Sequence, residues 1–534
     1  MTSALTNRPV AGPASGVGAQ SDGHSSTALR CPSDVLALAG RGLAVPPITG
    51  PRRVRRVAAR CQRMDDVRMR VVVLGAGPAG CVAALALARR GHDVVLVDRD
   101  ENPQRFDASA EQLFVTWDRP GIGQFRQPHN FLGLGRAVLR DEFPDIYAAL
   151  LARGAGEIDQ VDFLGEAVRE PGDRDLATIA CRRPIIDAVL RSAVADQPGV
   201  IFHASTVRDL RIAHGTHVSG VQFASGDTIA ADLVVDASGR NSGVGRWLAN
   251  HGAAAWPERS FDSSLLYYSR HYRFRGEPLP YASILGGPRG DLGYLAFAVF
   301  IGDNRTFCLC LMAPAWQKQW RALRERTAFE RVAHRLPGMA SWLDSAEPIS
   351  SVLPMGQLRN KLRETSADGA PLLTGIVPTG DARCHTNPTF AYGLSLALGH
   401  ANALAAAADS ARDDVDLAAT FERSVAADAA QRYQAVSAED RDRLRLWSGQ
   451  PINPTDRSDT MPLFLRSVVY RVAVHDPAIL RAVCRRINLL DPVDALAAND
   501  ELLDRAAKLF DELPPTDAPP PRATMLAALR DTAS

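Results

Sequence analysis

A strand–turn–helix–strand signature between residues 70 and 100 constrains the fold of this chain more than any other feature. An apolar run, Val71 to Leu74, leads directly into the turn Gly-Ala-Gly-Pro-Ala-Gly at residues 75–80, and a helical pattern follows. A second apolar run ends in Asp98. This pattern is typical of a parallel βαβ unit that binds a dinucleotide, with the pyrophosphate on free N–H groups at the helix N-terminus. The unit predicts an α/β fold and fits NAD and FAD equally.

Each glycine of the turn has an expected mechanical role. Gly75 makes the tight turn, Gly77 admits the pyrophosphate, and Gly80 lets the helix approach the strand closely. Asp98 lies 18 residues after Gly80, where a carboxylate accepts a hydrogen bond from a ribose hydroxyl. The apolar strands on both sides favour a ligand-binding turn over a glycine-rich turn without a ligand.

Composition is that of an ordinary globular chain. The 534 residues are 46% hydrophobic and 23% charged, with a formal net charge of +1. We therefore expect no nucleic-acid partner. No apolar run is long enough to cross a bilayer, which leaves peripheral membrane contact open, and reduced thiols favour a cytoplasmic protein. The eight cysteines are scattered without a Cys-x-x-Cys pair, which predicts reduced, buried thiols and no metal site.

Residues 1–68 lack apolar periodicity and are rich in Pro, Gly, Ser and Ala. They predict a disordered N-terminal extension, because such a segment cannot bury a core. Arginines gather between Arg52 and Arg63, which leaves a transit segment or a nucleic-acid arm as alternatives. A secretory signal is not expected, since no apolar h-region is present.

A second strand and turn follow in the middle of the chain. Four strands are expected near residues 200–203, 206–213, 217–223 and 228–235. The last carries the sequence ADLVVD into the small-residue turn ASGRNS at residues 237–242. A buried parallel strand that ends in such a turn is again typical of a ligand-facing edge.

The region 256–370 has a different pattern. Strand-like, aromatic-rich runs at 265–274, 294–301 and 306–312 predict an antiparallel sheet, and residues 316–336 predict one helix. A third strand and turn, Thr374 to Ala382, then precede an alanine-rich helix that is expected to reach about residue 409. Residues 413–534 are expected to be mostly helical, with a flexible tail.

Three separated motifs thus stand in one order: GAGPAG with Asp98, ADLVVDASGRNS at 231–242, and TGDARCHTNPTFAYGLSLAL at 379–398. Together they resemble the single-component FAD-dependent flavoprotein monooxygenases, the group typified by p-hydroxybenzoate hydroxylase and by squalene and polyether epoxidases. The loop RPGIGQFRQPHNFL at 119–132 is similar to one found in an actinobacterial branch of FAD-dependent oxidoreductases. The resemblance covers roughly residues 69–510.

The resemblance implies a domain organisation. A Rossmann-type, glutathione-reductase-like FAD-binding domain would comprise residues 69–255 and 371–412. A substrate domain built on the antiparallel sheet, 256–370, would be inserted into it, and the helical region 413–534 would follow.

The resemblance also implies site residues. The cofactor-binding set would be Gly75, Gly77, Pro78, Ala79, Gly80, Asp98, Arg99, Arg126, Asp236, Gly239, Gly380, Asp381, Pro388, Gly393 and Leu394. Arg119 is a further arginine of the same loop. His385 and Pro388 would lie next to the flavin as catalytic residues, although His385 can equally be a loop histidine bonded to backbone. The chain departs from the family pattern at two places. Residues 236–239 read Asp-Ala-Ser-Gly where the family commonly has Ala-Asp-Gly, and residues 390–393 read Phe-Ala-Tyr-Gly where the branch usually has Tyr-Gly-Gln-Gly.

The function implied is hydroxylation or epoxidation of a largely apolar small molecule. NADPH or NADH would reduce the FAD, and O2 would react through a flavin C4a-hydroperoxide, in a monomer or homodimer. A flavin reductase or dehydrogenase of the saturase type is the main alternative, and a non-enzymatic FAD-binding protein is another. A halogenase is disfavoured, because the Trp-x-Trp-x-Ile-Pro motif is absent and the lysines, Lys318, Lys361 and Lys508, lie far from the first motif.

Overall fold

The computed structural model describes residues 68–162, 169–253, 255–276, 286–514 and 518–530, all within the compact unit Met64–Ser534. The predicted disordered extension, residues 1–68, therefore falls almost wholly outside the described residues.

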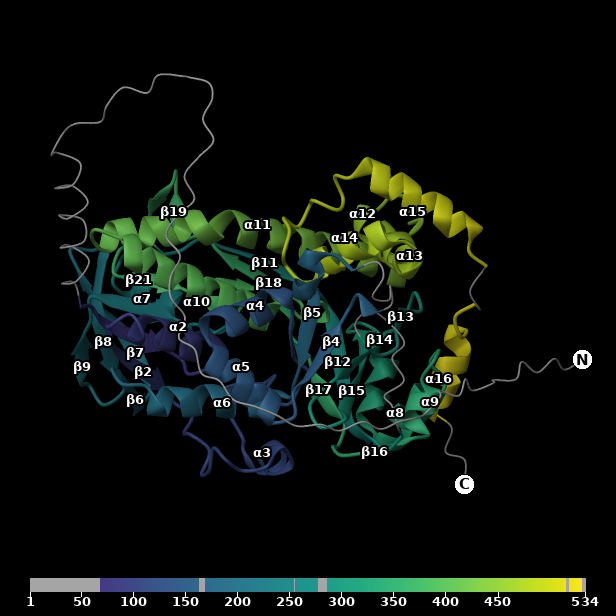
Figure 1. Ribbon diagram of the computed structural model, residues 1–534, viewed down its shortest axis with the longest axis horizontal. Helices are drawn as coiled ribbons and strands as arrows, with labels where there is room; N and C mark the ends of the chain where they lie inside the picture. The colour runs from purple at the N-terminus through teal and green to yellow at the C-terminus, as the bar shows by residue number, and fades with distance from the viewer. Residues whose placement is uncertain (1–67, 163–168, 254, 277–285, 515–517, 531–534) are drawn as a thin grey trace, which may run out of the picture. The chain divides into compact units, whose positions relative to one another are not determined.

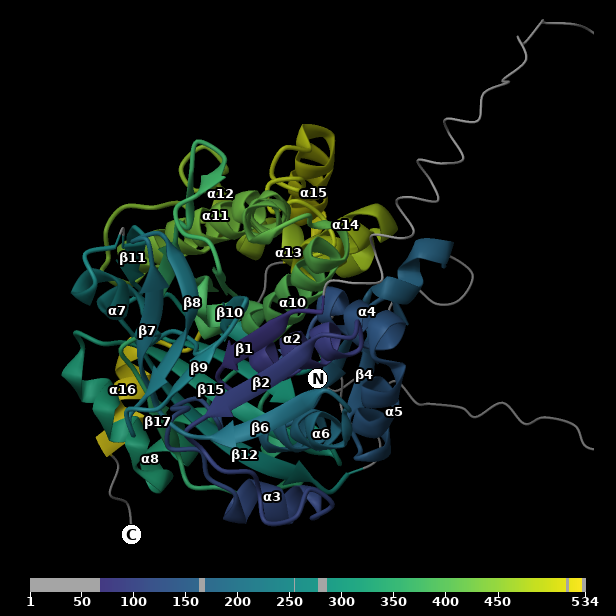
Figure 2. The same ribbon diagram turned by 90° about the vertical axis from the view of Figure 1, so that its left-hand side faces the viewer.

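A five-stranded parallel sheet lies behind the first motif. Its order is β21 (Ile376–Pro378), β10 (Leu233–Asp236), β1 (Arg70–Leu74), β2 (Asp93–Asp98) and β6 (Val200–Ala204), and every neighbouring pair is parallel. Figure 2 shows β1, β2 and β6 side by side. The prediction of an α/β fold with a parallel sheet is confirmed. Residues more than 300 apart in sequence contribute to it, because β21 adds to the edge beside β10.

The predicted strand 228–235 is in fact two strands. β9 (Thr228–Ala230) pairs with β8 (His217–Phe223) in an antiparallel sheet that also holds β7 (Val207–Ala213), and β10 belongs to the parallel sheet. The chain passes from one sheet to the other at Ala231 and Asp232, where the Asp232 N–H donates to the Arg70 carbonyl at 2.9 Å. The apolar pattern continues through this crossing, which is why the sequence does not mark it.

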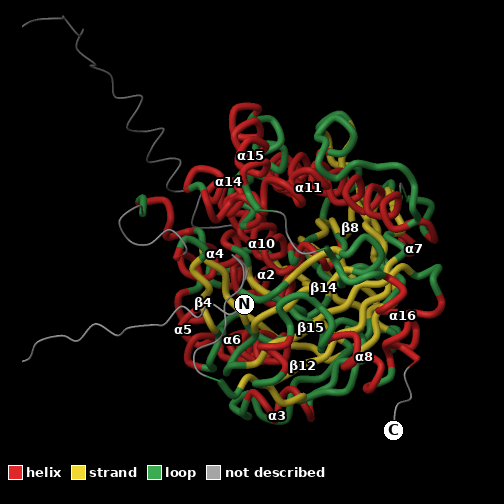
Figure 3. Tube along the Cα trace, turned by 90° about the vertical axis from the view of Figure 1, so that its right-hand side faces the viewer, coloured by secondary structure: helices red, strands yellow, loops and turns green. Residues whose placement is uncertain are grey.

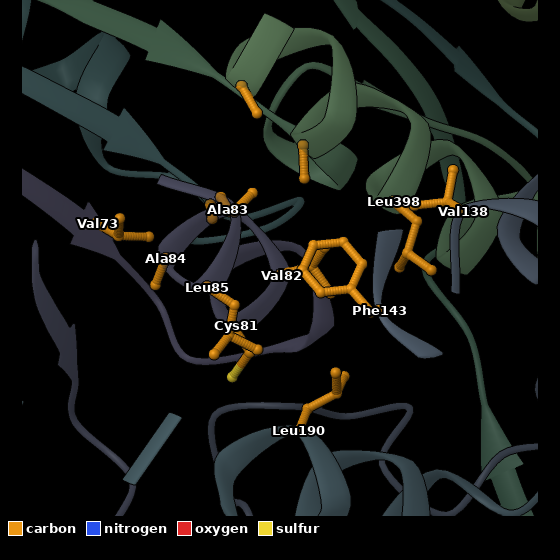
Figure 4. Packing of buried hydrophobic residues seen from close by; sticks show 14 of the residues in the cluster. Val73, Cys81, Val82, Ala83, Ala84, Leu85, Val138, Phe143, Leu190 and Leu398 are labelled. Carbon is orange, nitrogen blue, oxygen red and sulfur yellow. The ribbon is translucent and has the colours of Figure 1, made fainter. Parts of the chain in front are cut away.

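Helix α2 (Pro78–Ala88) is apolar on all sides and is buried accordingly, with only Ala79 partly accessible. It packs against the sheet, α6 (Arg183–Asp196) and α10 (Tyr392–Ser410) in one hydrophobic cluster. Figure 4 shows Val82 and Leu85 of α2 near Phe143, Leu190 and Leu398 of other segments. The first and third motifs are therefore joined by a common core.

The antiparallel sheet has the order β13 (Arg289–Asp291), β14 (Ala296–Ile301), β15 (Thr306–Pro314), β12 (Leu265–Phe274) and β16 (Ala346–Pro348), with β17 (Leu353–Met355) also paired to β12. Figure 3 shows β12, β14 and β15 together, with α8 (Arg326–Ala333) nearby. The predicted helix 316–336 is wrong as one element. It is a 3₁₀ segment, η4 (Lys318–Arg324), followed by α8, because Glu325 has extended backbone angles of φ −82° and ψ 132°.

The last described helix, α16 (Arg522–Arg530), lies where the sequence predicts a flexible tail. It packs on α8, with Met525 and Ala528 buried, and Arg331 Nε donates to the Ala528 carbonyl at 2.7 Å. Figure 1 shows the two helices side by side. Residues 531–534 lie outside the described residues. Among the described helices, none is both long and apolar enough to span a membrane.

The remaining elements complete the description. The helical ones are α3 (Ala110–Thr116), α4 (Gly133–Glu142), α5 (Pro144–Ala152), η3 (Pro171–Asp175), α7 (Val244–Asn250), α9 (Ala340–Leu343), η5 (Gly380–Ala382), η6 (Pro388–Phe390), α11 (Asp414–Trp447), α12 (Met461–Phe464), η7 (Leu465–Val469), α13 (Tyr470–Val472), η8 (Ala473–His475), α14 (Pro477–Ile487) and α15 (Asp500–Glu512). The strands are β3 (Asn130–Phe131), β4 (Gly156–Asp159), β5 (Ala177–Ala180), β11 (Glu258–Asp262), β18 (Arg359–Arg363), β19 (Ser366–Ala367), β20 (Ala370–Pro371) and β22 (Cys384–His385).

Gly80 is the residue on which the seating of α2 depends, and it gives a first prediction. A Cβ at this position would lie 1.7 Å from the Gly75 carbonyl oxygen. Since that neighbour is backbone, Gly80→Ala should lower the free energy of unfolding by at least about 3 kcal/mol, because a packed core has no room to relax. Urea denaturation followed by circular dichroism measures this loss. Gly245→Ala is the matched control, because Gly245 lies in α7 and has nothing within 4 Å of its Cβ position. Gly91→Ala does not serve, because Gly91 has φ +88°.

Candidate active site

A cavity of about 480 Å³ opens at the carboxyl ends of β1, β2 and β10. Twelve of the predicted site residues line it, and they come from all three motifs: Gly75, Gly77, Pro78, Ala79, Asp98, Arg99, Gly239, Asp381, His385, Pro388, Gly393 and Leu394. Gly80, Arg126, Asp236 and Gly380 do not line it. The structure thus brings the separated motifs into one site, since parallel strands deliver their turns to the same edge of a sheet.

Two helix N-termini face this cavity. Helix α2 begins after Gly77 and α10 begins after Ala391, and neither N-cap residue makes a side-chain capping hydrogen bond. Both residues line the cavity. The first N–H groups of a helix have no partner within the helix and carry partial positive charge. The arrangement therefore fits an anionic ligand that has polar groups at two separated points.

Gly77 tests whether the cavity fits a pyrophosphate. A Cβ at Gly75 would lie 2.7 Å from the Ala237 carbonyl oxygen, so protein packing alone requires glycine there. At Gly77 the nearest atom to such a Cβ is Arg183 Nη2, at 3.6 Å. Packing of the described residues thus leaves room for a side chain at Gly77, and that side chain would project into the cavity. The residues present fit a phosphate group that needs this space.

Gly380 and Asp236 act from behind the cavity wall. A Cβ at Gly380 would lie 2.9 Å from the Ala79 Cβ, so this glycine lets the third turn approach the start of α2. Its N–H donates to His400 Nδ1 at 3.2 Å. Asp236 is fully buried, and its carboxylate accepts hydrogen bonds from the hydroxyls of Ser238 and Ser242, both at 2.5 Å. It holds the second turn in shape.

Asp98 is more constrained than a simple ribose acceptor. Its Oδ2 accepts from the Ala76 N–H at 2.6 Å, from Arg119 Nη2 at 2.7 Å and from Arg191 Nη2 at 3.0 Å. Its Oδ1 accepts from the Asp100 N–H at 2.8 Å. A carboxylate offers about four acceptor positions. Oδ1 is therefore the oxygen with capacity left for a ligand hydroxyl.

The loop arginine at the cavity is Arg119 rather than Arg126. Arg126 donates to the Phe114 and Trp117 carbonyls, at 3.0 and 2.7 Å, and pairs with Asp118 at 2.9 Å. These bonds engage its guanidinium, and Arg126 does not line the cavity. Arg119 lines the cavity and is fully buried, with Nη1 2.5 Å from Asp187 Oδ2.

Arg183 is a cavity residue that sequence reasoning missed, and its carboxylate partner is also Asp187. Burial alone would raise the pKa of Asp187, but Arg183 and Arg119 outweigh it and hold that pKa below its usual value. Burial and the nearby Arg183 lower the pKa of His129 to about 4, so this cavity histidine is neutral at neutral pH. The only sequence signal for Arg183 is weak: it precedes a proline at the start of helix α6.

His385 and Asp381 form the polar pair of the third motif. His385 Nδ1 lies 3.1 Å from Asp381 Oδ2. Burial alone would raise the pKa of Asp381, but His385, with Arg183 and Arg240, outweighs it and keeps the carboxyl ionised. His385 Nε2 is buried and has no hydrogen-bond partner among the described residues. With the Nδ1 proton directed at Asp381, Nε2 of an uncharged ring would be an acceptor that is available to a ligand.

The turn that carries Pro388 is held by side chains from three other elements of the fold. The Asn387 N–H donates to Asn360 Oδ1 at 2.6 Å, and its side-chain amide donates to Asp440 Oδ1 at 2.7 Å. The Tyr267 hydroxyl donates to Asn387 Oδ1. Strands β12 and β18 and helix α11 thus fix one asparagine, and with it the position of Pro388 in the cavity wall.

Comparison with known proteins agrees with this geometry. The family profile described as glucose inhibited division protein A matches residues 70–264. Protein Rv3254 of Mycobacterium tuberculosis is 26% identical over 68% of this chain and 78% of its own length. Kynurenine 3-monooxygenase of Salinispora arenicola is 33% identical, over 36% of this chain and 40% of its own length.

The resemblance to the flavoprotein monooxygenases is confirmed. The relatives support an enzyme of the FAD-dependent oxidoreductase type with FAD as its cofactor. Two solved structures share the fold. PqsL, a probable FAD-dependent monooxygenase from Pseudomonas aeruginosa, has a TM-score of 0.54 at 18% identity and covers 74% of this chain and 100% of its own. The flavin-dependent brominase Bmp2 has a TM-score of 0.54 at 16% identity, covering 84% and 100%.

Gly77 supplies the prediction that separates ligand binding from folding. Gly77→Ala should raise the Kd for FAD by roughly tenfold or more, about 1.4 kcal/mol, because the new methyl group occupies the space of the ligand. The thermal stability of the FAD-free protein should remain that of the unsubstituted chain. Fluorescence titration of the FAD-free protein with FAD measures the Kd. Unchanged FAD affinity would contradict the assignment of Gly77 to the pyrophosphate.

His400 predicts an acid sensitivity. Burial lowers its pKa to about 4, against about 6.5 in the unfolded chain, so the unfolded state binds more protons between these values and stability falls as pH drops from 6.5 toward 4. At pH 5 this one histidine accounts for a loss of about 2 kcal/mol. His400→Asn keeps an acceptor for the Gly380 N–H and should reduce the loss between pH 7.5 and 5 by about that amount in urea denaturation. An equal loss in both proteins would contradict this prediction, because it would show that folding does not lower the pKa of His400.

Proposed function

We propose that the protein is an NAD(P)H-dependent FAD monooxygenase that hydroxylates or epoxidises a largely apolar small molecule. The observation that carries the proposal is the convergence of both uncapped helix N-termini with the His385–Asp381 pair in one cavity. Residues 69–255 and 371–412 would form the FAD-binding domain, and residues 256–370 the substrate domain. FAD, when bound, would supply the redox chemistry.

In this proposal the two ends of the cavity hold the two ends of FAD. Gly77 and the start of α2 would bind the pyrophosphate, and Asp98 Oδ1 a ribose hydroxyl. Asp381, Gly393 and Leu394 line the same cavity beside the start of α10, where they would hold the ribityl chain and the isoalloxazine. Pro388 would lie against the ring.

The antiparallel sheet would exclude water from the reacting atoms. Tyr267 and Met312 are cross-strand neighbours on one face, and both contact the 387–389 turn, since Thr389 Oγ1 donates to Met312 Sδ at 3.5 Å. Met355, paired with Tyr267, reaches the cavity. This apolar face beside a polar turn is suited to a substrate that must react away from solvent.

His385 would handle a proton in the reaction. Its free Nε2 can accept a proton from a substrate hydroxyl or, when protonated, donate to an oxygen of the ligand. Asp381 would fix the orientation of the ring through Nδ1. Because His385 would only transfer a proton and Asp381 would only position its ring, the reaction does not require a side-chain nucleophile.

Oxygen insertion is the decisive test. The purified yellow holoenzyme, reduced by NADPH or NADH in a stopped-flow experiment, should consume O2 in proportion to product when a substrate is present, and the product should carry one ¹⁸O atom from ¹⁸O2. A product formed without O2 would instead favour a saturase-type reductase or dehydrogenase. Halide incorporation would favour a halogenase. Flavin reduction with no substrate-stimulated O2 consumption across a broad panel would contradict a monooxygenase.

A further inference from the structure

A second recess opens on the side of the antiparallel sheet that carries α8. Its volume is about 640 Å³, and no residue that lines it also lines the candidate active site. Three arginines, Arg270, Arg324 and Arg326, line it together with the segment 348–352. No acidic residue is among the residues that line it. The recess is therefore cationic, and it is separate from the candidate active site.

Alternation along β12 places the recess on the opposite face of the sheet from the candidate active site. The Tyr267 hydroxyl donates to Asn387, in the turn that borders the cavity. Arg270, three residues later on the strand, donates through Nη1 to Glu330 of α8. Successive side chains of a strand point to opposite faces of a sheet, so positions 267 and 270 face opposite sides. A ligand in the recess would thus lie across the sheet from any molecule in the cavity.

Arg270 supplies a buried cation at the recess. The residue is only 3% exposed. Besides the bond to Glu330, its Nε donates to the Ser350 carbonyl at 3.1 Å, and its Nη2 donates to no described residue. Glu330 also accepts from the Tyr272 hydroxyl, at 2.8 Å, and does not line the recess. The guanidinium of Arg270 is therefore held in one orientation while it retains a donor for a ligand.

The other two arginines carry charges that no acid of the described residues compensates. Arg324 and Arg326 are exposed, and neither forms an ion pair with a described residue. Arg324 Nε donates to the Arg321 carbonyl at 3.2 Å. Arg326 begins α8, and the N-cap of this helix, Glu325, makes no side-chain capping hydrogen bond and does not line the recess. The free N–H groups of the first helical turn add partial positive charge to that of the arginines.

The segment 348–352 adds neutral donors and an apolar wall. The N–H groups of Ser350 and Ser351 donate to no described residue. The Ser350 hydroxyl donates to the Ser351 carbonyl at 2.7 Å, which holds the two residues in one arrangement. Ile349 and Val352 line the recess with apolar side chains. The recess thus combines charged donors, backbone donors and a small apolar surface.

We propose that this recess binds the phosphate group of a small molecule, at a site distinct from the one proposed for FAD and substrate. A phosphate carries a charge of about −1.5 to −2 at pH 7 and offers three strong acceptor oxygens, which matches three guanidiniums and two free N–H groups. A carboxylate offers a single charge and two oxygens, and it would leave donors of the recess unused. Arg324 and Arg326 would bind the phosphate directly, since a guanidinium can donate two parallel hydrogen bonds to it.

The test is titration calorimetry of the FAD-loaded protein with phenyl phosphate and with inorganic phosphate, in about 0.15 M NaCl so that distant charges are screened. Both probes should bind. Tighter binding of phenyl phosphate would identify a phosphate monoester as the ligand, with Ile349 and Val352 in contact with its organic part, and equal affinity would identify the free anion. Arg326→Gln and Arg324→Gln should each weaken binding roughly tenfold or more. Because both arginines are exposed, the thermal stability of these variants should be unchanged.

Arg335→Gln is the matched control. Arg335 follows α8, is exposed and forms no ion pair with a described residue, yet it does not line the recess. Its substitution removes the same charge from the same face and should change each Kd by less than twofold. Equal weakening in Arg335→Gln and Arg326→Gln would overturn the proposal, because it would show attraction by the overall charge of this face. Absence of binding by both phosphates would also overturn it.

A third titration separates a recess from a surface. Vesicles of phosphatidic acid in phosphatidylcholine present the same phosphate monoester on a membrane. Because Arg270 is buried, the soluble phosphates should reach the full set of donors and the vesicles should not bind. Binding to vesicles without binding of either soluble phosphate would overturn the proposal and assign the face to membrane contact. None of these titrations depends on oxygen consumption, so their outcome is independent of the proposed monooxygenase activity.

Discussion

The side-by-side alignment of three parallel strand ends is the constraint on which the candidate site depends. Leu74 of β1 lies in register with Asp236 of β10, and Asp236 with Pro378 of β21. The Ala237 N–H donates to the Leu74 carbonyl, and the Thr379 N–H donates to the Asp236 carbonyl. Each turn is thereby held to the end of the preceding strand in the sheet. Helices α2 and α10 inherit their positions from these turns, and the cavity is the space between them.

Features that depend on short-range patterns were predictable from the sequence. Strand β1, helix α2 and helix α10 follow from apolar runs bounded by glycine-rich turns, and the prediction of a parallel sheet follows from the same signature. The errors occur where a local pattern continues through a change of partner. The 228–235 run is uniformly strand-like, yet its two halves pair with different sheets. The 316–336 run is uniformly helical in pattern, yet Glu325 is extended. Neither sheet membership nor one residue's backbone angles can be read from apolar periodicity.

The same distinction explains which site residues the sequence revealed. Most of the predicted residues in the three turns line the cavity, because the turn itself presents them, whereas Gly80, Asp236 and Gly380 do not line it. Side chains that arrive from loops are different. Arg119 and Arg126 stand seven residues apart in one loop with equal chemical suitability, and only long-range partners separate them: Asp98 and Asp187 for Arg119, two nearby carbonyls for Arg126. Tyr267 likewise reaches Asn387 across 120 residues of sequence.

The buried charges around Asp98 position three segments of the chain, and this role is distinct from any contribution to the free energy of unfolding. Burying an ion pair costs desolvation that its attraction roughly repays, so such pairs are weak evidence for net stability. Here one carboxylate oxygen collects donors from three segments, namely the glycine turn through Ala76, the loop through Arg119 and helix α6 through Arg191. Removal of any one donor would leave a buried charge undersatisfied, so the three segments are held in one arrangement. The Asp98 carboxylate therefore fixes the wall of the cavity, and a ligand would meet a site that is already organised.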